Sequence, residues 1–89
     1  MLKIELVPDL EQCIEMVARR KYAELSRVLL RSEERDVETE RKLKILRCFL
    51  ETADFKKLRA ESEKMLIEGK KVRFLVYFDN SVKYEMQVT

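Results

Sequence analysis

The sequence predicts an α+β fold for a single small domain that spans residues 1–89. Apolar and polar residues alternate near both ends of the chain, as they do in half-buried strands. Between these ends, apolar residues recur at the helical period over most of residues 9–68. The single proline, Pro8, and the single glycine, Gly69, fall where the first strand and the last helix are expected to end. We therefore expect the order β-α-α-α-β-β, with a three-stranded sheet that ends in a β-hairpin and helices packed on one of its faces.

The first strand is expected over residues 2–7. Its inward residues are Leu2, Ile4 and Leu6, and its outward residues are Lys3 and Glu5. Pro8 ends the strand because it has no backbone N–H to donate to a neighbouring strand.

The first helix is expected over residues 9–31. Asp9 suits the N-cap position, and Gln12 stands three residues later, where a capping box has its second member. One apolar stripe runs along the helix, which indicates one buried face. The stripe consists of Ile14, Ala18, Tyr22, Leu25 and Leu29.

Two further helices are expected over residues 33–51 and 54–68. Ser32 is the N-cap candidate of the second helix, and either Thr52 or Asp54 opens the third. Gly69 suits the position after the third helix, where a left-handed backbone conformation is common. The inward residues are Leu43, Leu46, Phe49, Leu50 and Ala53 on the second helix, and Phe55, Leu58, Met65 and Leu66 on the third.

The chain ends in two strands, expected over residues 71–78 and 82–88. A three-residue loop, Asp79-Asn80-Ser81, places Phe78 opposite Val82, Val76 opposite Tyr84 and Phe74 opposite Met86. A two-residue loop would instead set Phe74 and Val76 against charged residues, because a one-residue slip turns every side chain to the other face. The three-residue loop is therefore the predicted connection.

The composition limits where the protein acts. Charged residues make up 40% of the chain with a net charge of only +2, and Lys/Glu enrichment with few amide side chains is typical of a thermophile. No apolar run is long enough to cross a membrane, and the N-terminus is too charged for a signal peptide. We expect a cytoplasmic protein with no membrane partner, in which Cys13 and Cys48 are thiols.

The sequence provides poorly for catalysis, so we expect no enzyme, no cofactor and no metal. It contains no histidine, which removes the usual general base at neutral pH and the imidazole metal ligand. It contains one glycine, so no glycine-rich loop can hold a phosphate. The acidic residues at 33–40 lack the glycine-containing loop of a calcium site. We infer no catalytic residue and no small-molecule substrate.

Apolar residues also occur on the outward side of nearly every element, which indicates burial against a second subunit. A two-fold homodimer is the simplest source of that burial. The residues proposed for its interface are Leu75 and Tyr77 on the outward face of the sheet, with Met16, Leu30, Ile45 and Ile67 on the helices. The alternative is that the aliphatic stems of lysine and arginine cover these side chains.

Basic residues on the first two helices indicate a different function, nucleic-acid binding. The proposed contacts are Arg20, Arg27, Arg31, Arg41, Lys44 and Arg47. Both clusters lie toward the C-terminal ends of helices that begin with acidic residues, where the helix dipole itself favours positive charge. We therefore favour a non-enzymatic, homodimeric interaction or regulatory module, and keep nucleic-acid binding as the alternative.

Overall fold

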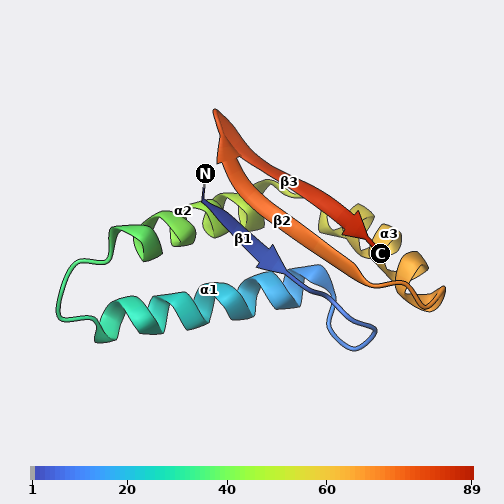
Figure 1. The fold of residues 1–89 in the computed structure, drawn as a ribbon, viewed down its shortest axis with the longest axis horizontal. Helices are drawn as coiled ribbons and strands as arrows, with labels where there is room; N and C mark the ends of the chain where they lie inside the picture. The colour runs from blue at the N-terminus through green and yellow to red at the C-terminus, as the bar shows by residue number, and fades with distance from the viewer. Residues whose placement is uncertain (1) are drawn as a thin grey trace.

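The computed structural model describes residues 2–89 and confirms the predicted α+β fold (Figure 1). The elements follow one another as β1 (Lys3–Leu6), α1 (Ile14–Arg31), α2 (Val37–Thr52), α3 (Phe55–Ile67), β2 (Val72–Asp79) and β3 (Ser81–Val88). Every strand bound agrees with the predicted one to within one residue.

The three strands form one antiparallel sheet in the order β1-β2-β3, so β2 is central and the other two are edges. The hairpin has the predicted register, with Phe78 opposite Val82 and Val76 opposite Tyr84. Asn80 makes the turn at a φ of 64°, a left-handed conformation that asparagine tolerates better than most residues.

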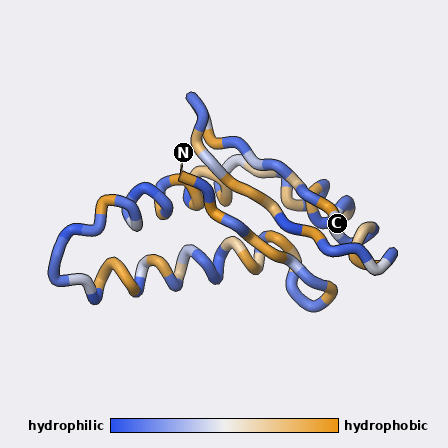
Figure 2. Tube along the Cα trace, viewed as in Figure 1, coloured by the Kyte–Doolittle hydropathy of each residue, from blue (hydrophilic) through white to orange (hydrophobic). Residues whose placement is uncertain are grey.

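The helices pack against one face of the sheet and leave its other face open (Figure 1). The helical hairpin of α1 and α2 runs past the end of the sheet and elongates the molecule to 45 × 28 × 22 Å. Hydrophobic residues concentrate along β1 and β2 and recur along the helices, whereas the α1–α2 connection and the tip of the β-hairpin are hydrophilic (Figure 2).

The core lies between the inward row of the sheet and the helices. Phe49 of α2 is central to it, since its ring meets those of Phe55 and Tyr84 edge-on, with centroids 5.3 and 5.5 Å away. The buried apolar residues are Ile4, Leu6, Ile14, Ala18, Ile45, Leu46, Phe49, Leu58, Val72, Phe74 and Val76.

The predicted start of the first helix is wrong. α1 begins at Ile14, and Asp9 closes a separate turn before it: its carboxylate accepts from the backbone N–H groups of Glu11 (2.8 Å) and Gln12 (2.7 Å). The Asp9 N–H donates to the Gln12 carbonyl, so Gln12 is the end of this turn and not a capping-box partner. Cys13 occupies the N-cap position without a side-chain bond.

The predicted start of the second helix is also wrong. α2 begins after Asp36, whose carboxylate accepts from the Thr39 N–H (3.1 Å) and the Thr39 hydroxyl (2.7 Å). Ser32 instead lies at the C-terminal end of α1, where its N–H donates to the carbonyls of Val28 and Leu29.

The ends of the third helix agree with the prediction. Asp54, one of two candidates, caps α3 by accepting from the Lys57 N–H at 3.2 Å. Gly69 has a φ of 82° and donates to the Leu66 carbonyl, while Lys70 donates to that of Met65. This pair of bonds is a Schellman motif, which requires the left-handed conformation that glycine adopts without strain.

Candidate functional site

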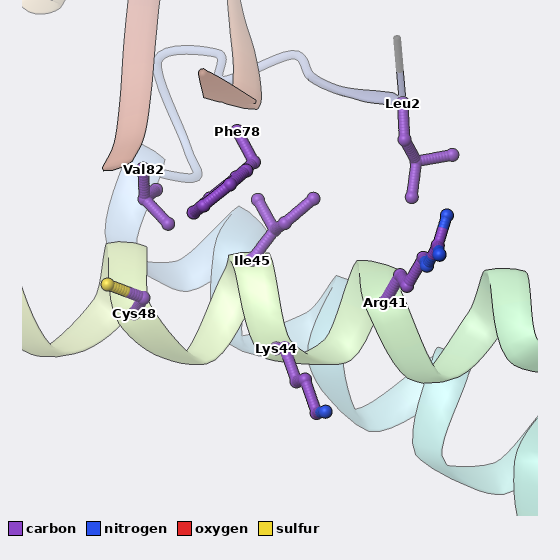
Figure 3. A pocket seen from close by; sticks show the side chains of 7 residues that line it. All are labelled: Leu2, Arg41, Lys44, Ile45, Cys48, Phe78 and Val82. Atoms are coloured by element: carbon purple, nitrogen blue, oxygen red, sulfur yellow. The ribbon is translucent and has the colours of Figure 1, made fainter. Parts of the chain in front are cut away.

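A cleft of about 610 Å³ lies between α2 and the tip of the β-hairpin (Figure 3). We call it the α2–hairpin cleft. Its lining consists of Leu2, Arg41, Lys44, Ile45, Cys48, Phe78 and Val82.

Three separate elements supply this lining. The α2 residues are spaced three, four and seven positions from Arg41, so they lie on one side of that helix. Phe78 and Val82 face each other across the hairpin, and Leu2 immediately precedes β1. The register of the β-hairpin therefore decides which side chains reach α2.

The floor of the cleft is apolar and partly uncovered. Ile45, Phe78 and Val82 point into the same space (Figure 3). Ile45 is only 6% exposed and belongs to the core, so its predicted outward position is wrong. Phe78 remains 56% exposed although it lies in the inward row of β2. A large aromatic ring in such a position is a surface that another molecule can cover.

The cleft is positively charged at its rim. Neither Arg41 nor Lys44 makes an ion pair with any carboxylate of residues 2–89, although Lys42 between them pairs with Glu38 at 3.5 Å. The Arg41 side chain extends toward Leu2, while that of Lys44 extends away from Phe78 (Figure 3). Arg41 therefore places an unpaired guanidinium at the Leu2 end of the cleft, and Lys44 belongs to the lining although its side chain extends away from Phe78 (Figure 3).

A second hollow adjoins the first and is lined by Leu2, Val37, Glu38 and Arg41. Leu2 and Arg41 belong to both hollows. The two hollows therefore follow one another along the side of α2.

The structure scatters the residues proposed for a dimer interface. Leu30 is 86% exposed near the C-terminal end of α1, and Ile67 is 75% exposed at the C-terminal end of α3. These two ends lie at opposite extremes of the long axis (Figure 1). Met16 is exposed near the start of α1. These residues therefore do not form one compact cluster.

Leu75 and Tyr77 lie on the open face of the sheet, as predicted, but polar side chains surround them. Glu5 and Glu85 flank Leu75, and Lys3 and Lys83 flank Tyr77. The Lys3 ammonium lies 5.7 Å from the centre of the Tyr77 ring, within cation–π range. Both apolar side chains are half-buried. Long polar side chains of the same subunit can provide this degree of cover.

The basic residues proposed for nucleic-acid contact are all exposed. Arg20, Arg27 and Arg31 are spaced seven and four residues apart, which keeps them on one face of α1. Arg41 and Lys44 lie on α2 at the cleft. Arg47 differs from the others, because it pairs with Glu51 at 3.2 Å. The basic residues therefore form two groups on two helices, not one continuous stripe.

Sequence reasoning missed the cleft because it assigned Phe78 and Val82 to the covered row of the sheet. The one available signal was length: the hairpin strands are longer than β1, so their far end has less of the fold to cover it. Among residues 2–89 no three potential metal ligands of the His, Cys, Asp and Glu types come together. No helix in that range is long and apolar enough to cross a bilayer.

The fold defines a small α+β protein in which three helices cover one face of a three-stranded antiparallel sheet. Residues 1–87 match the model of an uncharacterised protein family, and the chain belongs to that family. No curated protein and no solved structure matches the chain with significant similarity.

Proposed function

We propose that the protein is a non-enzymatic interaction module, acting as a homodimer, whose α2–hairpin cleft binds an extended segment of a partner protein. The segment would carry an apolar side chain next to a carboxylate. The observation that carries this proposal is an uncovered apolar floor beside an unpaired cation: Phe78 lies over Ile45, and Arg41 has no acidic partner among residues 2–89.

The floor supplies the affinity in this proposal. Full burial of a phenylalanine side chain is worth about 1.5–3 kcal/mol, and Phe78 still has roughly half of that burial to gain. Aromatic side chains in the centre of an interface are frequent binding hot spots. An apolar side chain of the partner would fill the space between Phe78, Val82 and Ile45.

The rim supplies the preference for an acidic segment. An arginine presents a planar fork of N–H donors that matches the two oxygens of a carboxylate. Arg41 makes no ion pair with residues 2–89, so its charge and its donors can serve such a bond. A basic segment would be disfavoured because it would approach Arg41 and Lys44 together.

The shape supports an extended chain over a compact small molecule. Two hollows that share Leu2 and Arg41 follow one another along α2, and an extended peptide can occupy both with alternate side chains. We place the module in the cytoplasm, where its two free thiols, Cys13 and Cys48, stay reduced.

Selection from a random twelve-residue peptide library tests the proposal. Wild-type protein should enrich peptides in which an apolar residue stands beside Asp or Glu. The Arg41→Glu variant should lose these peptides, because it replaces the free cation with a carboxylate. Arg47→Glu is the matched control: it makes the same change on an exposed arginine of the same helix outside the cleft. The cleft would be refuted as the site if wild type enriched no class of peptide, or if the enriched peptides bound Arg41→Glu as well as they bind wild type.

Nucleic-acid binding is the second candidate function, favoured by the unpaired arginines on α1. Arg20, Arg27 and Arg31 share one exposed face and make no ion pair with residues 2–89. Binding of a fluorescent duplex, single strand or RNA at about 50 mM salt should then weaken steeply as salt rises. A lack of binding to all three at low salt would remove this candidate.

A further inference from the structure

We propose that two copies of this chain associate along β3 and form one continuous six-stranded sheet, with Tyr84 on the two-fold axis. This inference rests on the homodimeric form proposed above and assigns its interface. It moves the interface from the scattered outward residues to a backbone edge, where the geometry of the strand itself fixes the register.

β3 is a long, regular edge whose charged side chains, Lys83 and Glu85, lie on the open face of the sheet. It pairs with β2 without interruption from Val88 opposite Val72 to Ser81 opposite Asp79, and its other side has no neighbouring strand among residues 2–89. It contains no proline, glycine or bulge. Proteins commonly interrupt or cover such edges, because an exposed regular edge is a template for another strand. The opposite edge, β1, has four residues and is followed by Pro8.

The backbone groups that face the free edge follow from the pairing with β2. Lys71 and Thr89 exchange both backbone hydrogen bonds, at 3.0 and 2.9 Å, so they are a hydrogen-bonded pair. Hydrogen-bonded and non-hydrogen-bonded pairs alternate in an antiparallel ladder. Val82, Tyr84 and Met86 therefore direct their N–H and C=O groups away from β2, toward the free edge.

Side-chain charge selects one register among those the backbone allows. Two antiparallel copies of β3 must pair outward-facing groups with outward-facing groups, which places even-numbered residues opposite even-numbered residues. With Tyr84 opposite Tyr84 of the second copy, Lys83 lies opposite Glu85 and Val82 opposite Met86. A shift in one direction sets Lys83 against Lys83, and a shift in the other sets Glu85 against Glu85. Opposite charges in cross-strand pairs stabilise a sheet, and like charges destabilise it.

The inner side of β3 is incompletely covered, which fits the same arrangement. Tyr84 and Val88 point to the side of the sheet that carries the helices, yet they remain 42% and 37% exposed. The Tyr84 ring touches Phe49 edge-on, and its remaining surface is free. In the proposed dimer the two Tyr84 rings lie side by side across the axis and cover part of that surface.

Charge reversal tests the register. Sedimentation of wild type at micromolar concentration should give twice the 10.7 kDa chain mass. Lys83→Glu and Glu85→Lys should each weaken the dimer by roughly ten- to a hundred-fold, because each places two like-charge pairs across the axis. The two variants mixed together, and the double variant Lys83→Glu/Glu85→Lys, should regain wild-type association, since every pair is again Lys opposite Glu. Lys3→Glu, on the same face at the other edge, is the matched control and should leave the dimer intact.

Hydrogen exchange of backbone amides gives a second readout, which uses the wild-type protein and needs no variant. The amides of Val82, Tyr84 and Met86 should become protected as wild-type concentration rises, while those of Lys83 and Glu85 are protected by β2 at every concentration. A wild type that stays monomeric to about 1 mM, or a variant mixture that fails to associate while wild type does, would overturn the edge interface. A monomer that still selects peptides at the cleft would overturn this inference alone, and a dimer that selects none would refute only the peptide site.

Discussion

Asp36 is the side chain on which the start of α2 depends. The hydroxyl and the amide of Thr39 both donate to its carboxylate, and these hydrogen bonds hold the pKa of Asp36 below its usual value. A carboxylate with a lowered pKa contributes stability above its unfolded pKa, about 4, and loses that contribution as pH falls through the folded value.

Replacement of Asp36 by asparagine should therefore flatten the acid limb of the stability curve. Asparagine keeps an oxygen that can cap the helix but has no proton to bind. The free energy of unfolding in urea, measured from pH 7 to pH 2.5, should show a wild-type advantage that shrinks below about pH 4. A difference between the two proteins that is constant across this range would show that the Asp36 bonds are not formed in solution.

Gly69 ends α3 in a conformation that other residues adopt with strain. A Cβ atom added there would meet no atom within 4 Å, so any cost comes from the backbone alone. Gly69→Ala should cost about 1–2 kcal/mol and lower Tm by several degrees in a domain of this size. Asn80→Gly is the matched change in the opposite sense, at a φ of 64°, and should be neutral or slightly stabilising. Equal melting temperatures for Gly69→Ala and wild type would contradict the Schellman motif.

Capping residues were predictable where one candidate stood close to an apolar stripe, and not where several competed. Gly69 was the single candidate for the position after the third helix, and Asp54 was one of two candidates for its N-cap; both were predicted. Asp9 was misassigned because an Asx turn and an N-cap use the same carboxylate bonds two and three residues on. Ser32 was misassigned because propensity ranks serine and aspartate alike at an N-cap, and only packing decides which turn of the chain enters the helix layer.

The β-hairpin was the element most fully predictable from sequence. Residues alternate on both strands, and only one register places the apolar rows of both strands on the same face of the sheet. The faces of α2 were not predictable in the same way. Ile45 and Cys48 add apolar residues beside the main stripe, so periodicity alone placed Ile45 outward although it is in the core. The cleft was missed for a related reason: Phe78 belongs to the inward row, but the helices do not reach it fully.

The open face of the sheet gives a test that separates a face interface from an edge interface. Tyr77 has Lys3 on one side and Lys83 on the other, so Tyr77→Glu would gain two opposite-charge neighbours of about 0.2–1 kcal/mol each. The fold should persist, and association through β3 should persist with it. Light scattering after gel filtration measures both mass and elution. A folded but monomeric Tyr77→Glu protein would favour an interface on the open face.

At the scale of the whole molecule, the cleft and the free edge of the sheet share one residue. The Val82 side chain lines the cleft, while its backbone groups face the free edge. A dimer formed along β3 would therefore present two clefts, each next to the new interface. Two linked sites bind a partner that carries two segments more tightly than one site does.

The sharpest test of the central proposal uses the two cysteines of the chain. Cys48 lines the cleft, and Cys13 lies at the N-terminal end of α1, outside it; both are half-buried free thiols. Maleimide alkylation, followed residue by residue by mass spectrometry, compares wild type with and without a peptide selected from the library. Peptide at about a hundred times its Kd should slow alkylation of Cys48 more than tenfold and leave the rate at Cys13 unchanged. An unchanged rate at Cys48, or equal slowing of both thiols, would contradict binding in the α2–hairpin cleft.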